Sequence, residues 1–148
     1  MADFESLPKV PAWALTWLGQ PDIATRPCAW QALGDGWLKR RIERDNLSLT
    51  SYCLEDALNL AAGHFEDACY TAYRRLARDL AGGQAAEPVR LWNYLPGILA
   101  PLGALEHRYM VFNAGRFRAL REWFGVEAMD ARIATASGVG HHGRDFVV

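Results

Sequence analysis

The residue with the clearest chemical potential is Arg116, because the sequence places this cation among apolar side chains. On a helical wheel of about 100° per residue, Arg116 falls between Phe112 and Leu120 in an apolar stripe. A buried guanidinium needs an anionic partner, since burying an unpaired charge costs several kcal/mol. One explanation is an internal ion pair, for which the candidate partners are Glu66, Asp67 and Asp145. The other is a site for a carboxylate-bearing ligand, which arginine holds through two parallel hydrogen bonds.

Gly115 precedes this arginine in the same predicted helix. Glycine inside a helix costs about 1 kcal/mol relative to alanine. Its lack of a Cβ atom would let a ligand or another stretch of backbone come close.

Asn93 and Tyr94 form a second candidate site. They close the apolar stretch "VRLWNY", and Pro96-Gly97 then predicts a turn. Asparagine is a poor strand residue, so its position at the end of a strand needs a reason. Two explanations stay open: an asparagine that caps the turn beside a packed tyrosine, or two side chains that face a pocket.

The stretch "SGVGHHGRD", residues 137–145, contains three glycines and is predicted to be a loop. Its backbone N–H groups could surround an anion. It matches neither a phosphate-binding loop nor a dinucleotide-binding fingerprint, and a mobile loop is the alternative. His141 and His142 are adjacent and have no third ligand at a suitable spacing, so no metal site is predicted.

Length, charge and cysteine usage narrow the class of protein. The 148 residues are enough for one domain, assigned to residues 1–148. A net charge of −1 predicts no nucleic-acid partner, and no apolar run reaches the roughly 18 residues of a membrane helix. The acidic N-terminus does not resemble a signal peptide. Three widely spaced cysteines are typical of reduced thiols, so a cytoplasmic location is expected.

The elements that must position these residues are strands and then helices. Strands are expected at 12–18, 28–33 and 36–43, with Gly34-Asp35-Gly36 predicted as a hairpin turn between the last two. Residues 52–60 could be helix by propensity, or a strand that ends at Gly63.

Two helices are predicted from apolar spacing, at 64–80 and 105–125. Between them lie a loop at 81–88 and a strand at 89–94, and a short strand follows at 146–148. The predicted fold is α+β, a mixed and mostly antiparallel sheet with both helices packed on one face.

Three segments resemble the chorismatase family, whose members are also described as pteridine-dependent deoxygenase-like. The resemblance covers residues 88–148. The matching residues are Trp92, Asn93 and Tyr94, then Leu105, Tyr109, Phe112, Gly115 and Arg116, then Ala134, Thr135, Gly138 and Gly140. The chain departs from the family pattern by one extra residue between Glu106 and Tyr109, and by Ser137 in the last motif.

This resemblance implies a RidA/YjgF-like (chorismate mutase-like) fold, in which residues 53–60 are a strand and the first helix begins near His64. It implies conversion of chorismate to a hydroxybenzoate-type acid plus pyruvate, for pigment or secondary-metabolite biosynthesis, without a metal or organic cofactor. The implied substrate-binding residues are Arg116, Asn93, Tyr94, Tyr109 and Gly138.

No catalytic residue is assigned, because the family's acid residues belong to a second domain that is expected to be absent here. The expected partners are therefore a carboxylate ligand such as chorismate, together with a second domain or further copies of the chain. The alternative is a stand-alone RidA-like module that binds small molecules or assembles without catalysis.

Overall fold

The computed structural model describes residues 29–44, 47–82, 87–103 and 107–148, and the predicted strand at 12–18 lies outside them. Within the described residues, six strands form one sheet in the order β1-β2-β3-β6-β4-β5. The strands are β1 (Gln31–Gly34), β2 (Trp37–Arg44), β3 (Leu47–Leu54), β4 (Arg90–Pro96), β5 (Thr135–His141) and β6 (Phe146–Val147). The helices are η3 (Ala57–Asn59), α2 (Ala62–Ala81), α3 (Arg108–Phe124) and α4 (Met129–Arg132). Neighbouring strands are antiparallel except β4 and β5, which are parallel.

The predicted hairpin turn is confirmed between β1 and β2. Gly34, Asp35 and Gly36 all have positive φ angles, of 89°, 51° and 74°. This left-handed backbone is easy for glycine and tolerated by aspartate, which explains the composition of the turn.

The segment after β3 differs from both predictions. The strand ends at Leu54, and a turn and the short 3-10 helix η3 follow before α2 begins at Ala62. Asp56 has a positive φ of 56°, which ends the extended conformation, and its backbone N–H donates to the carboxylate of Asp145 at 2.8 Å. Neither a helix nor a strand through residue 60 forms, because the chain turns here to meet the segment before β6.

The prediction of a glycine-rich loop at 137–145 is also wrong for its first half. Residues 135–141 form strand β5, which pairs in parallel with β4 over its whole length. The glycines are used for close packing, because a Cβ atom at Gly140 would lie 2.3 Å from Cγ2 of Ile98. Glycine in a strand often marks such a close approach.

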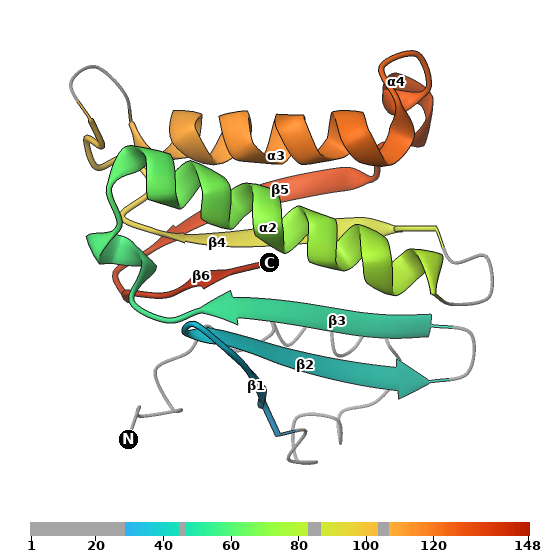
Figure 1. Cartoon of the computed structure of the whole chain (residues 1–148), viewed down its shortest axis with the longest axis horizontal. Helices are drawn as coiled ribbons and strands as arrows, with labels where there is room; N and C mark the ends of the chain where they lie inside the picture. Colours follow the sequence, from blue (N-terminus) through green and yellow to red (C-terminus); the bar gives the residue numbers. More distant parts are fainter. Residues whose placement is uncertain (1–28, 45–46, 83–86, 104–106) are drawn as a thin grey trace.

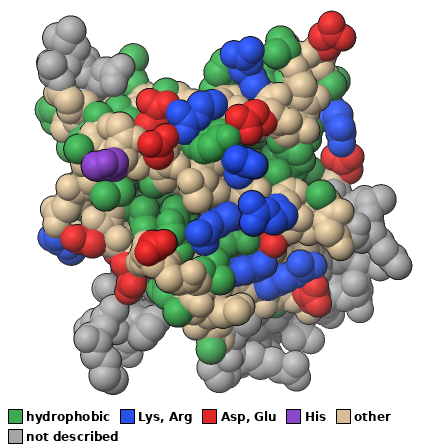
Figure 2. All heavy atoms as spheres, viewed as in Figure 1, with side chains coloured by type: hydrophobic (Ala, Val, Ile, Leu, Met, Phe, Trp, Pro, Cys, Tyr) green, Lys and Arg blue, Asp and Glu red, His purple; other side chains and the backbone are tan. Residues whose placement is uncertain are grey.

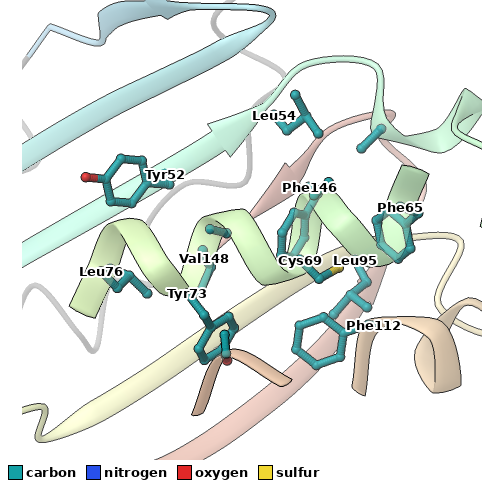
Figure 3. Packing of buried hydrophobic residues seen from close by; sticks show 14 of the residues in the cluster. Tyr52, Leu54, Phe65, Cys69, Tyr73, Leu76, Leu95, Phe112, Phe146 and Val148 are labelled. Atoms are coloured by element: carbon teal, nitrogen blue, oxygen red, sulfur yellow. The ribbon is translucent and has the colours of Figure 1, made fainter. Parts of the chain in front are cut away.

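Helices α2 and α3 lie side by side on one face of the sheet, as predicted (Figure 1). They cover the core, which combines apolar side chains of both helices with those of β3, β4 and β6. Phe146 lies at its centre, with edge-on ring contacts to Phe65 of α2 and Phe112 of α3 at centroid distances of 5.7 and 6.0 Å (Figure 3). Burial of these aromatic side chains supplies much of the stabilisation.

The buried face of α3 is rotated relative to the predicted stripe. Val111, Phe112, Gly115 and Ala119 are buried, whereas Tyr109, which the prediction assigned to the apolar stripe, remains 42% exposed. Gly115 lies where the two helices approach most tightly, and Phe112 contacts the ring of Tyr73 in α2 beside it.

Charge is unevenly distributed over the helix-bearing side of the molecule. Figure 2 shows Lys and Arg side chains gathered over the second half of α2 and the adjoining strands. Among the described helices, none combines the length and the apolar composition needed to cross a membrane.

Candidate functional site

Asn93 is a buried and fully engaged amide, and it does not cap the turn. Its side chain is 1% exposed and points from the middle of β4 toward the helices. The hydroxyl of Tyr73 in α2 donates to its Oδ1 at 2.7 Å, and its Nδ2 donates to the backbone oxygen of Ser137 in β5 at 3.1 Å. One asparagine therefore connects helix, central strand and edge strand, which explains a polar residue in an apolar strand.

Arg116 is half-buried and lies beside the same tyrosine. Its Cζ atom is 5.9 Å from the centre of the Tyr73 ring, and its buried Nε has no hydrogen-bond partner among the described residues. The structure thus brings two predicted site residues, Asn93 and Arg116, next to one phenol that the sequence analysis did not single out.

Of the two explanations for Arg116, the internal ion pair is not observed among the described residues. Arg118, two positions further along α3, binds Glu66 at 3.1 Å and Asp67 at 2.7 Å. Asp145 accepts the backbone N–H of Asp56 instead. Among the described residues, no ion pair joins a carboxylate to Arg116, whose guanidinium lies beside the Tyr73 ring instead.

Gly138 and Tyr109 lie next to each other at the β5 end of this region. Gly138 pairs with Asn93 across the parallel strands. A Cβ atom at Gly138 would lie 3.2 Å from Cε2 of Tyr109, so the tyrosine ring rests on the glycine. Tyr109 also stacks on Phe112 with a centroid distance of 6.1 Å. Four of the five predicted site residues therefore share the helix-bearing side of β4 and β5.

Tyr94 is the exception, because neighbouring residues of a strand point to opposite faces. Its ring packs on the other side of the sheet, against the small cluster of Leu38, Cys53 and Val147. Burial raises the pKa of the Tyr94 phenol. Tyr94 therefore does not meet Arg116 or Asn93 within this fold.

The space beside Gly115 is occupied by protein. A Cβ atom there would lie 2.2 Å from the backbone oxygen of Glu66 and 2.9 Å from Cβ of Cys69. Of the two predicted uses of this glycine, the close approach of another backbone is therefore the one observed.

Among the described residues, the arginine buried most completely is Arg108, which the sequence analysis missed. It is 3% exposed, and its guanidinium donates to the backbone oxygens of Ala57 at 3.1 Å and Leu58 at 2.8 Å. It also lies 4.7 Å from the centre of the Phe65 ring. Its partners lie about fifty residues earlier in the chain, so the apolar spacing of the predicted helix does not indicate its burial.

For chemistry, the region around Tyr73 offers the guanidinium of Arg116 and the phenol itself, but no carboxylic acid among the described residues. None of the hydrogen bonds or ion pairs among the described residues joins a carboxylate to Tyr73, Asn93 or Arg116. The cation can attract an anionic group, since arginine matches carboxylate geometry. Proton transfer to a substrate would need a further group.

Replacing Tyr73 with phenylalanine is expected to make stability less sensitive to alkaline pH. Burial raises the pKa of Tyr73 from 10.0 to about 12, although the charge of Arg116 opposes the shift. In the wild type, the unfolded chain therefore loses the Tyr73 proton at a lower pH than the folded chain. The free energy of unfolding of the wild type consequently falls by about 2 kcal/mol between pH 10 and 12, and the variant lacks this contribution. At pH 7 the variant should be about 1–2 kcal/mol less stable, because Asn93 Oδ1 loses its donor.

Urea unfolding at pH 7, 9 and 11 measures this effect. Tyr52, Cys53 and Cys69 also have raised pKa values, so the quantity of interest is the difference between the variant and the wild type. That difference should shrink as the pH rises from 9 to 11. If the difference in free energy of unfolding between the variant and the wild type stays constant from pH 9 to 11, Tyr73 does not contribute to the pH dependence of stability.

Strand order, helix placement and the Asn93 network together define an α+β domain whose mixed sheet is covered on one face by two helices. The family model described as chorismatase FkbO/Hyg5-like, N-terminal, matches residues 40–148. The chain belongs to this family of chorismatase N-terminal domains, which confirms the resemblance seen in the sequence.

A crystal structure of a chorismatase shares the fold with a TM-score of 0.55 and 21% sequence identity. The match covers 78% of this chain and 32% of that chain, so the present chain spans about a third of the length of that chorismatase. No match was found among curated protein sequences.

Proposed function

We propose that this domain takes part in converting chorismate to pyruvate and a hydroxybenzoate-type acid, and that the acid is used for pigment or secondary-metabolite biosynthesis. The observation that carries the proposal is the family match over residues 40–148. The free thiols Cys53 and Cys69, both buried, are compatible with the reducing cytoplasm proposed as its location.

In this proposal Arg116 attracts one of the two carboxylates of chorismate. The support is geometric, since its guanidinium is half-buried beside the Tyr73 ring and has no anionic partner within the described residues. Tyr109 and Gly138 form the neighbouring wall, and Asn93 braces the wall from behind through its two hydrogen bonds. Tyr94 lies on the sheet face away from Arg116 and is not part of this proposed carboxylate site.

The protonation step is assigned to another domain. In an elimination route, the bond between the ring carbon and the enol ether oxygen breaks, the ring loses a proton, and enolpyruvate becomes pyruvate when its methylene carbon is protonated. In a hydrolytic route, that methylene carbon is protonated first, water adds to the ether carbon, and the hemiketal releases pyruvate and a dihydroxy acid, which gives a hydroxybenzoate by losing water. Either route needs a proton on the methylene carbon of the enol ether. A carboxylic acid with a raised pKa would supply it. Because no carboxylate contacts Arg116 or Tyr73 in the described part of the chain, we place this acid in the second domain or in a partner chain.

Pyruvate release provides the test. The chain is incubated with chorismate, alone and with the separately expressed C-terminal domain of a chorismatase, and pyruvate is measured by coupled reduction with lactate dehydrogenase. Pyruvate is expected in the mixture, with a several-fold loss of activity at low chorismate for Arg116→Gln. Arg121→Gln, which removes an exposed arginine of the same helix, serves as the matched control and should retain activity.

Chorismate binding measured by calorimetry separates the two candidate functions. Binding with turnover in the mixture supports the enzyme. Binding without pyruvate under any condition would favour the stand-alone binding module, and the absence of both would contradict the proposal.

A further inference from the structure

A separate groove lies between the second half of α2 and strands β2 and β3, on the charged area visible in Figure 2. Its volume is about 450 Å³, within the range of small-molecule sites. Its lining residues are Leu33, Lys39, Tyr52, Tyr70, Thr71, Arg74, Arg75, Arg78 and Asp79. None of them is among the predicted site residues.

The acidic residue of this groove is already neutralised. Asp79 binds the Lys39 ammonium at 2.7 Å and accepts the hydroxyl of Tyr52 at 2.8 Å. Tyr52 is buried, and burial together with Asp79 raises its pKa, so the phenol stays protonated and keeps donating. Asp79 therefore has little capacity left to neutralise other cations of the groove.

Two arginines of the groove have no anionic partner in the described part of the chain. The guanidinium of Arg75 lies 4.8 Å from the ring centre of Trp37 and 5.9 Å from that of Tyr52. Stacking on an aromatic face holds a guanidinium in place while its N–H edge stays free for an oxyanion. Arg78 is exposed and makes no hydrogen bond or ion pair with a described residue.

The spacing of these arginines suits one ligand group. Residues three apart on a helix have Cβ atoms about 5–6 Å apart on the same side, so both side chains of the pair can reach one anion. Arg74 is less free, because its Nη1 donates to the hydroxyl of Tyr70 and its Nε lies 3.8 Å from Glu122. A phosphate monoester carries three acceptor oxygens and nearly two charges, which matches two guanidinium forks better than a single carboxylate does.

We propose that this groove binds a small organic phosphate, with Arg75 and Arg78 holding the phosphate group and Leu33 beside the organic part. The proposed phosphate site does not depend on the proposed conversion of chorismate, because the groove shares no residue with the region of Tyr73, Asn93 and Arg116.

Calorimetric titration with phenyl phosphate tests this assignment, in a phosphate-free buffer whose ionic strength is kept constant with sodium chloride. Saturable binding is expected, together with a rise in melting temperature that grows with ligand concentration. Arg78→Gln should weaken binding about fivefold to tenfold, as expected for losing a charged hydrogen bond. This variant should fold normally, because Arg78 is exposed.

The control Arg121→Gln removes the same charge from α3 and should change affinity less than about twofold. Equal weakening in both variants would indicate general charge attraction and overturn the site. Phthalate, a compact dicarboxylate, is the comparison ligand. Binding of phthalate without phenyl phosphate would overturn the phosphate assignment, and the absence of saturable binding by either would overturn the proposal as a whole.

Discussion

Replacing Gly115 with alanine is expected to lower the free energy of unfolding by about 3 kcal/mol, the upper end of the usual cost of overpacking. The new Cβ atom would lie 2.2 Å from the backbone oxygen of Glu66 and 2.9 Å from Cβ of Cys69. Neither atom belongs to the end of a flexible side chain, so α2 and α3 would have to move apart. That separation would loosen the contacts of both helices with the core, and the gain of about 1 kcal/mol in helix propensity does not offset it.

Urea unfolding monitored by circular dichroism measures the change, and Gly63→Ala is the matched control. Gly63 also lies in a helix, in the first turn of α2, but a Cβ atom there would meet nothing within 4 Å. The control should be as stable as the wild type, or more stable by up to about 1 kcal/mol. If both variants have wild-type stability, the close crossing of α2 and α3 does not exist in solution.

Replacing Arg108 with alanine is expected to cost about 3 kcal/mol of stability, because it removes two hydrogen bonds and leaves a cavity. The Arg108 guanidinium satisfies the backbone oxygens of Ala57 and Leu58, and Ala57 is fully buried. Burial lowers the pKa of Arg108, because its charged form loses contact with water in the interior. The two carbonyl groups belong to the turn between β3 and α2, so this arginine ties that turn to α3.

Arg108→Met separates the two contributions. Methionine retains much of the packing against Phe65 but cannot donate a hydrogen bond, so its loss should be smaller, about 1–2 kcal/mol. The exposed Arg121 of the same helix is the control, and Arg121→Ala should stay within about 0.5 kcal/mol of the wild type. Equal urea midpoints for Arg108→Ala and Arg121→Ala would contradict a structural role for the buried guanidinium.

Much of the secondary structure could be predicted because it depends on local chemistry. The turn at Gly34-Asp35-Gly36 follows from backbone conformations that few other residues adopt. Helix α2 follows from apolar spacing, and it extends over Ala62–Ala81 where 64–80 was predicted. The family resemblance also followed from the sequence, since its motifs are short and ordered along the chain.

The candidate site was predicted only in part, because a helical wheel locates a stripe but does not show what lies against it. The sequence placed Arg116 within the apolar stripe, between Phe112 and Leu120, whereas α3 makes its close approach to α2 at Gly115. Arg116 is therefore half-buried and makes no ion pair with a described residue, and Arg118 pairs with Glu66 and Asp67 instead.

By itself, the sequence determined the family, the α+β class and the residue types that gather near β4, because propensities and motifs are properties of neighbouring residues. The tertiary structure decided which of those residues meet. Strand alternation separates Tyr94 from Asn93, parallel pairing with β4 turns a predicted loop into β5, and the fold brings Lys39 beside Asp79, forty positions away. These contacts join segments distant in the chain, so they depend on packing between elements, which no local pattern encodes.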